Sequence, residues 1–130
     1  MKLKIAVLPG DGIGPEVTNE SIKVLNCIAK KFNHEVEMNE GLVGAIAIDH
    51  HNNPYPDETH SLCLESDAIL FGALGDPKYD NDPKAKIRPE QGLLEMRKKL
   101  GLYANLRPTL VFDSLLHMSP IKEERITGTD

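Results

Sequence analysis

The sequence predicts an α/β fold, a parallel-rich sheet flanked by helices, of which the chain supplies only the opening third of a larger enzyme. Three observations support this class. Short apolar runs alternate with amphipathic helical patterns along the 130 residues. A glycine-rich turn at residues 10–14 joins the first apolar run to the first helix. The alternation stops at residues 127–130, just where a further strand is expected to begin.

The first strand–helix–strand unit is expected within residues 3–39. The run from Leu3 to Leu8 ends at Pro9 and Gly10, which is typical of a buried strand. A helix should follow from Pro15 to about Phe32, because proline suits the first helical position and acidic residues favour that end of a helix. Its apolar stripe comprises Ile22, Leu25, Ile28, Ala29 and Phe32. Alternating residues over 34–39 predict the second strand.

The later elements follow the same alternation. Residues 41–48 suit a short helix and residues 50–56 a turn, after which Asp57 is expected to cap a helix reaching Ser66. Residues 68–74 predict the clearest buried strand. The stretch 75–86 is rich in proline, aspartate and asparagine, and a loop of about a dozen residues indicates a function. The sequence then predicts a helix over 90–100 ending at Gly101, extended chain over 103–107, and a helical turn over 121–126.

Composition narrows the function classes. The chain is 40% hydrophobic and 27% charged, which is ordinary for a soluble globular protein. A net charge of −5 with 5% aromatic residues argues against nucleic-acid binding. No apolar stretch approaches the length of a membrane span, so a cytoplasmic protein is expected. Cys27 and Cys63 lie far apart on predicted helices and are expected to be reduced, buried thiols.

The turn at residues 10–16 (GDGIGPE) stands where a dinucleotide-binding loop would stand. The standard Rossmann spacing requires a glycine at position 15, which is proline here, so that fingerprint is absent. The pattern fits a ligand loop and a purely structural turn equally well. The histidines lack supporting carboxylates at metal-binding spacings, and no nucleophilic serine motif is present, so no metal or hydrolase site is predicted within the chain.

Two arginines carry the clearest chemical signal. On a helix, Glu90, Leu93, Leu94 and Arg97 share one face, and a mostly apolar face with a guanidinium suits a pocket for a branched carboxylic acid. By strand alternation, Arg107 shares a face with Tyr103 and Asn105. Each arginine can grip a carboxylate through two parallel hydrogen bonds, which lysine cannot do. The alternative is that both arginines form surface salt bridges.

Four segments together resemble a known family. Residues 8–17 (LPGDGIGPEV), 70–75 (LFGALG), 86–97 (KIRPEQGLLEMR) and 102–108 (LYANLRP) look like the isocitrate/isopropylmalate, or β-decarboxylating, dehydrogenases, and most like their 3-isopropylmalate branch in leucine biosynthesis. The resemblance covers residues 4 to about 124. It implies an NAD-dependent oxidation of 3-isopropylmalate with loss of carbon dioxide, assisted by Mg²⁺ or Mn²⁺, in a homodimer. The implied fold is that of this family, which binds NAD without the Rossmann fingerprint.

The resemblance also implies roles for individual residues. Arg97 and Arg107 match the substrate clamp, and Leu93 and Leu94 match the apolar patch for the isopropyl branch. The cofactor-lining residues would be Asp76, Pro77, Lys78, Tyr79, Asp80, Pro83, Ile87, Arg88, Pro89 and Glu90, with Glu90 beside the nicotinamide. Residues 1–102 would belong to the cofactor-side domain, and residues 103–130 would begin the second, substrate and dimerisation domain.

The resemblance marks what the chain does not contain. Family members are well over twice as long, and their catalytic tyrosine and lysine, their metal-binding aspartates and a third substrate arginine come later than residue 130. No catalytic residue and no metal ligand is therefore expected here, and the chain alone is expected to be inactive. Two alternatives stay open: a sibling dehydrogenase for tartrate, malate or homoisocitrate, and a truncated chain without catalysis.

Overall fold

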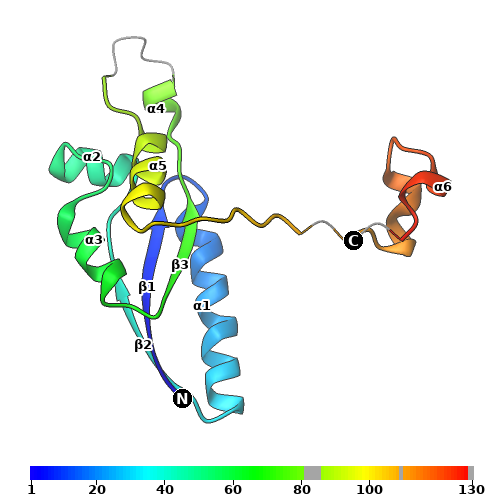
Figure 1. Cartoon of the computed structure of the whole chain (residues 1–130), viewed down its shortest axis with the longest axis horizontal. Helices are drawn as coiled ribbons and strands as arrows, with labels where there is room; N and C mark the ends of the chain where they lie inside the picture. The colour runs from blue at the N-terminus through cyan, green and yellow to red at the C-terminus, as the bar shows by residue number, and fades with distance from the viewer. Residues whose placement is uncertain (81–85, 109, 129–130) are drawn as a thin grey trace.

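The computed structural model describes residues 1–80, 86–108 and 110–128, and it shows three parallel strands surrounded by helices (Figure 1). The elements are β1 (Lys2–Gly10), α1 (Gly14–Lys31), β2 (Glu35–Glu40), α2 (Ala45–His51), α3 (Asp57–Leu64), β3 (Ala68–Ala73), α4 (Pro77–Asp80), α5 (Pro89–Lys99), the 3-10 helix η1 (Asp113–Met118) and α6 (Glu123–Ile126). The predicted fold class is confirmed.

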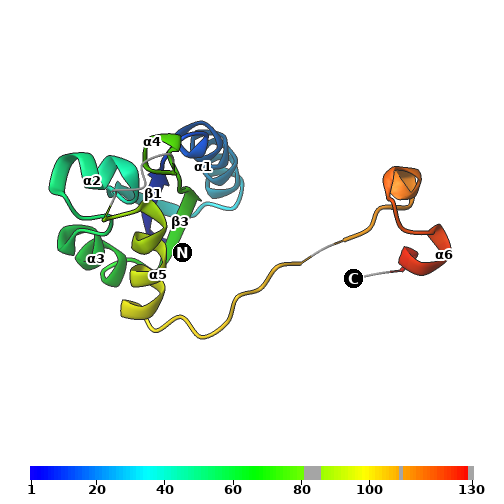
Figure 2. The ribbon, with the colours of Figure 1, turned by 90° about the horizontal axis from the view of Figure 1, so that it is seen from above.

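The sheet has the order β2-β1-β3, with both pairings parallel. The crossover from β1 to β2 runs to one side, and the crossover from β2 to β3 runs back over β1. Because such crossovers are right-handed, their helices must lie on opposite faces of the sheet. Seen from above, α1 accordingly lies on one side of the strands, and α2, α3 and α5 lie on the other (Figure 2). This arrangement buries the central strand on both faces.

Burial along the strands follows their position in the sheet. In β1, the run Ile5–Leu8 is buried throughout, as its continuous apolar pattern predicts. In the edge strand β2, Val36 and Met38 are half-buried between exposed glutamates. The buried strand predicted over residues 68–74 is confirmed as the strand β3, but its burial is not, because Ala68 is exposed and the other residues of β3 are only half-buried. Among the described residues, β3 has a neighbouring strand on one side only.

Helix α1 matches its predicted span but not its predicted stripe. Ile22 and Leu25 are half-buried and Ala29 is buried, whereas Ile28 and Phe32 are 43% and 56% exposed. The buried face is instead set by Gly14 and Thr18, where the helix crosses closest to the strands. Cys27 also faces outward, so the expectation that both thiols are buried is wrong for Cys27 and confirmed for Cys63.

The connections after β2 depart from prediction in detail. Helix α2 begins at Ala45 rather than near residue 41, because Gly44 before it has φ of +86° and cannot be helical. Asp57 is the first residue of α3 and not its cap, since Pro56 occupies that position in an extended conformation. The predicted loop 75–86 contains the short helix α4, and residues 81–85 lie outside the described ranges.

An apolar core lies between the sheet and helices α3 and α5. It is formed by Ala6, Leu8, Val43, Tyr55, Cys63 and Met96, with half-buried Leu62, Ile69, Phe71, Leu74, Leu93 and Leu100 packed around it. Gly92 lets α5 approach closely, because a β-carbon there would collide with the backbone of Pro54. Gly101, with φ of +65°, ends α5 as predicted. The core therefore fixes the helix that carries Arg97.

Beyond Gly101 the chain changes character. Residues 102–108 are extended, as predicted for residues 103–107. They are also exposed, and they pair with no strand in the described part of the chain. They lead away from the sheet to η1 and α6, where Leu116 and Ile126 are buried (Figure 1). The predicted turn over 121–126 corresponds to α6, whereas η1 was not anticipated. None of the helices in the described ranges combines the length and apolar character that a membrane crossing needs.

Candidate functional site

The carboxyl ends of β1 and β3 define the candidate site. Both strands are parallel and end side by side, at Gly10 and Ala73. The connection that leaves β1 leads to β2 on one side of β1, whereas β3 lies on the other side of β1. The loops that follow β1 and β3 therefore lead in different directions. In open α/β sheets, ligands bind in the crevice that this divergence creates. The predicted cofactor segment, which begins directly after β3, starts at this crevice.

Backbone hydrogen bonds hold the glycine-rich turn after β1, both to β3 and within the turn itself. The Asp11 N–H donates to the Ala73 carbonyl at 2.7 Å, and the Gly14 N–H donates to the Asp11 carbonyl at 2.8 Å. Pro15 has no N–H, and Glu16 places a carboxylate in the first turn of α1. A pyrophosphate would therefore meet few donors and a negative charge. Of the two interpretations left open by the sequence, the geometry favours the structural turn.

A hollow of about 250 Å³ opens beside this turn. It is lined by Gly10, Asp11, Gly12, Pro15, Ala45, Ile46, Asp49 and Asp76. Asp76 is the one member that the sequence assigned to cofactor binding. Because three aspartates line it, the hollow favours a neutral or cationic group over a phosphate.

Asp49, from α2, holds the side chains of α4. Its Oδ1 accepts hydrogen bonds from Lys78 Nζ at 2.6 Å and from the Tyr79 hydroxyl at 2.8 Å. The Lys78 bond lowers the pKa of the Asp49 carboxyl, and the bond to Asp49 raises the pKa values of Lys78 and Tyr79. The same lysine lies 5.2 Å from the centre of the Tyr79 ring. The predicted cofactor segment is thus tied to α2.

The other predicted cofactor residues lie in α4, in the segment that leads into α5 and at the start of α5. The Asp76 carboxylate accepts the Lys78 N–H at 2.9 Å, and Pro77 is exposed beside it. Asp80 ends α4, and Pro83 lies outside the described residues.

Ile87 and Arg88 lead into α5, where the Arg88 N–H donates to Gln91 Oε1 at 3.1 Å. Pro89 is fully buried, so it supports the helix and offers no surface to a cofactor. Glu90 is exposed and lies close to Gly75, since a β-carbon on Gly75 would stand 3.5 Å from Glu90 Oε1. Glu90 is therefore the predicted residue from α5 that reaches the crevice after β3.

The predicted substrate residues on α5 are only partly on one surface. Leu94 is 65% exposed, and Arg97 is half-buried in the last turn. Leu93 is half-buried and packs against the core instead. Among the described residues, Arg97 forms no ion pair, so the alternative of a surface salt bridge is not realised there. The helix offers a guanidinium beside one open leucine.

Arg107 lies apart from this surface. It stands in the exposed stretch 102–108, and no carboxylate in the described ranges pairs with it. Ala104 and Leu106, expected on the opposite strand face, are exposed as well, because this stretch joins no sheet. The structure therefore does not bring Arg107 together with Arg97. Their joint role in a clamp stays a prediction.

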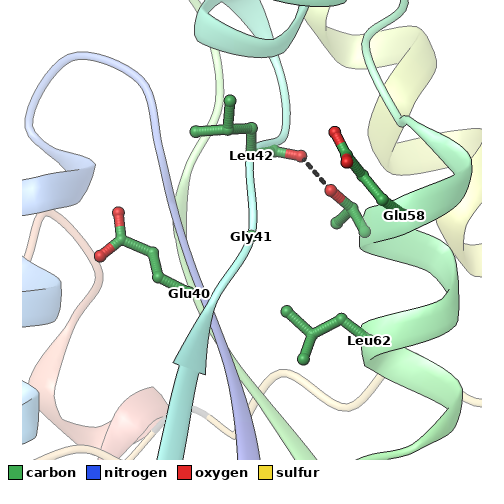
Figure 3. A pocket seen from close by; sticks show the side chains of 6 residues that line it. Glu40, Gly41, Leu42, Glu58 and Leu62 are labelled. Carbon is green, nitrogen blue, oxygen red and sulfur yellow. Dashed lines mark hydrogen bonds between the residues drawn. The ribbon is translucent and has the colours of Figure 1, made fainter.

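A second hollow lies between the end of β2 and α3 (Figure 3). It measures about 300 Å³ and is lined by Glu40, Gly41, Leu42, Glu58, Thr59 and Leu62. The Thr59 hydroxyl donates to the Leu42 carbonyl at 2.7 Å, so it is engaged in holding the loop to α3. Two glutamates at the mouth disfavour acidic ligands. None of the predicted site residues lines this hollow, and we do not consider it the functional site.

Two residues at the crevice were not assigned a role from the sequence: Asp11 and Asp49. An aspartate between two glycines at the end of a strand could have been noticed, because such a turn leaves its carboxylate near neighbouring loops. Asp49 carried no comparable signal, since its partners are about 30 residues away in the chain. Among the described residues, no cluster of three histidine, cysteine or acidic side chains is arranged to hold a metal ion.

Comparison with known proteins gives a consistent result. The family model described as isocitrate/isopropylmalate dehydrogenase matches residues 4–130. The chain is 53% identical to a 3-isopropylmalate dehydrogenase of Bacteroides fragilis and 55% identical to that of Bacillus subtilis, both over 130 residues. It is 56% identical to the Aquifex aeolicus enzyme over 129 residues. These matches cover 99–100% of this chain but 35–37% of the relatives, so the chain spans about a third of their length.

A solved structure shows the same relationship. The apo form of a β-decarboxylating dehydrogenase from Thermococcus kodakarensis superposes with a TM-score of 0.59 at 32% sequence identity. The superposition covers 78% of this chain and 27% of that one. The sheet and helices described above are therefore similar to part of a larger dehydrogenase.

Proposed function

Because this chain belongs to the isocitrate/isopropylmalate dehydrogenase family, we propose that it forms the cofactor-side portion of a 3-isopropylmalate dehydrogenase. The proposed reaction is the NAD-dependent oxidation and decarboxylation of 3-isopropylmalate in leucine biosynthesis. The observation that carries the proposal is the identity of 53–56%, along essentially the whole chain, to three proteins with that name. The surface of α5 formed by exposed Glu90 and Leu94 and half-buried Arg97 also supports it.

Substrate recognition follows from the chemistry of α5. The planar guanidinium of Arg97 can form two parallel hydrogen bonds with one carboxylate of the diacid. Leu94, with 65% of its surface exposed, offers the isopropyl branch an apolar contact. Burying three carbons there contributes about 2 kcal/mol, at about 0.8 kcal/mol for each carbon. Leu93 supports this surface from the core side, and Arg107 would complete the clamp once residues 102–108 are folded against the substrate.

The residues at the crevice fit one end of NAD. When bound, NAD supplies the acceptor for the hydride that leaves the hydroxyl-bearing carbon. Its oxidised nicotinamide ring is cationic, which suits both the exposed Glu90 carboxylate near Gly75 and the hollow lined by three aspartates. The pyrophosphate does not fit the turn after β1, where Pro15 removes a donor and Glu16 adds a negative charge. We therefore propose that residues 75–80, residues 86–88 and Glu90 line the nicotinamide end, with buried Pro89 supporting them, and that the rest of NAD binds outside this chain.

The described residues do not offer a site for a divalent cation. The family resemblance implies Mg²⁺ or Mn²⁺, but the described residues offer no cluster of three suitable ligands. We assign no metal ligand and no proton-transferring residue to this chain.

The two-part architecture supports the proposed boundary near residue 102, with residues 103–130 beginning the substrate and dimerisation domain of a homodimer.

A chimeric enzyme tests the proposal. Residues 1–130 would replace the matching third of the Bacillus subtilis relative, and NADH formation would be followed with 3-isopropylmalate and Mg²⁺. We expect activity. We expect Arg97→Lys to lower kcat/KM by a factor that corresponds to a loss of about 2–5 kcal/mol of transition-state stabilisation, because lysine cannot form the two parallel hydrogen bonds by which arginine pairs with a buried carboxylate. Arg125→Lys, on exposed α6, is the matched control and should change little.

Three further results bear on the same proposal. A folded chimera without NADH formation would contradict it, and an unchanged kcat/KM for Arg97→Lys would remove Arg97 from the clamp. A preference for tartrate, malate or homoisocitrate over 3-isopropylmalate would favour a sibling dehydrogenase. The isolated chain should show no turnover, because Arg107 is not held near α5 and the described ranges hold no cluster of three side chains that could bind a metal ion.

A further inference from the structure

The carboxylate of Asp11 is a junction of three separate connections. It is only 5% exposed, and its Oδ2 accepts the Ala45 N–H at 2.8 Å and the Gly75 N–H at 3.2 Å. Its Oδ1 accepts the Ile46 N–H at 3.0 Å. Asp11 belongs to the turn after β1, Ala45 and Ile46 begin α2, and Gly75 follows β3. One buried side chain therefore joins the three loops at the carboxyl end of the sheet.

Backbone N–H groups and close packing hold the Asp11 carboxylate in place. No cationic side chain in the described part of the chain pairs with it, so the three N–H groups carry its stabilisation. The space is tight, because a β-carbon on Gly44 would collide with Asp11 Oδ2. Gly44 is itself fixed by the bond from its N–H to the Pro54 carbonyl at 2.8 Å. A longer or uncharged side chain at position 11 cannot reproduce this arrangement.

The junction controls the segment that follows β3. Asp11 holds the segment at Gly75, and it also holds the start of α2. One turn later in α2, Asp49 holds Lys78 and Tyr79 of the same segment. We infer that Asp11 is a positioning residue that sets the place of residues 75–80 relative to Glu90 on α5. The inference rests on the proposed function, in which this segment lines the nicotinamide end of NAD.

The kinetic test uses Asp11→Asn in the chimeric enzyme. Asparagine has nearly the same size but turns one acceptor into a donor facing a backbone N–H. We expect KM for NAD to rise about tenfold, as expected for losing one hydrogen bond to a charged group. KM for 3-isopropylmalate should stay within about twofold, because the hydrogen bonds that the Asp11 carboxylate accepts come from Ala45, Ile46 and Gly75 and not from the substrate residues of α5. The matched control is Asp67→Asn. The Asp67 carboxylate also accepts a backbone N–H, that of Lys4 at 2.8 Å, but at the opposite end of the strands.

The outcomes separate the inference from the proposed function. Equal rises in both KM values, or the same rise in Asp67→Asn, would overturn the positioning role. If the chimera shows no activity at all, the proposed function fails, and the isolated chain still decides about Asp11. In its native hydrogen–deuterium exchange, the amides of Ala45, Ile46 and Gly75 should be protected together, and Asp11→Asn should release all three while the α1 amides stay protected. Unrelated exchange rates for the three amides in the unsubstituted chain would refute the junction without any variant.

Discussion

The body, residues 1–101, and the trailing segment, residues 102–128, both contain large apolar side chains, but the body buries many of them and the trailing segment leaves most of them exposed. In the body, Leu8, Val43 and Tyr55 are fully buried. In the trailing segment, Tyr103 is fully exposed and Leu106 and Met118 are 85% and 72% exposed. The two proposed clamp arginines fall on either side of this boundary. The difference indicates that the body folds on its own contacts, whereas the trailing segment needs a surface that the described residues do not supply.

The largest expected effect comes from a substitution at Gly10, where the backbone at the end of β1 packs closely against β3. Gly10 has φ of +72°, and a β-carbon there would collide with the Ala73 carbonyl. Gly10→Ala should therefore lower the free energy of unfolding by about 3 kcal/mol or more, a large share of a typical total. Gly101→Ala is the matched control at the boundary: its φ is +65° but its surroundings are empty, so it should cost only about 1 kcal/mol. Urea titration of both variants measures the difference, and equal costs would contradict close packing at the end of β1.

A smaller effect concerns the buried hydroxyl and thiol of the core. Burial raises the pKa of the Tyr55 hydroxyl and of the Cys63 thiol above their ordinary values of 10.0 and 9.0. The unfolded chain therefore loses these protons at lower pH than the folded chain does. The free energy of unfolding should fall as pH rises above 9, and more steeply above 10.

Tyr55→Phe should flatten the second part of that decline. Tyr103→Phe, in the exposed trailing segment, should leave the decline as it is. Urea titrations between pH 7 and the alkaline limit, at steps of about half a unit, would show the slopes. An unchanged slope in Tyr55→Phe would exclude Tyr55 as the source.

The smallest expected effect is the removal of the trailing segment. A chain ending at Gly101 keeps the whole core, so its urea midpoint should equal that of the 130-residue chain within error. A clearly lower midpoint would show that residues 102–130 stabilise the body. That result would also weaken the proposed domain boundary, because it would place the trailing segment in the same cooperative unit.

Most of the fold could be predicted because its signals are local. The continuous apolar run of β1, the alternation in β2 and the glycine at 101 each act over a few residues, and the structure confirms them. The errors occur where distant contacts decide. Ile28 and Phe32 fit a helical stripe, but the face that α1 buries is set by how closely Gly14 and Gly72 let it approach the strands. Cys27 is exposed for the same reason.

By itself, the sequence determined the three strands and the longer helices, the surface of α5 that carries Glu90, Leu94 and Arg97, and the family to which the chain belongs. Only the tertiary structure decided that Leu93 turns to the core, that Pro89 is buried and that Asp11 joins three loops. The physical reason is distance along the chain. Periodicity records which side of an element is apolar, but a buried carboxylate finds partners 34 to 64 residues away, and only the packed sheet brings them together.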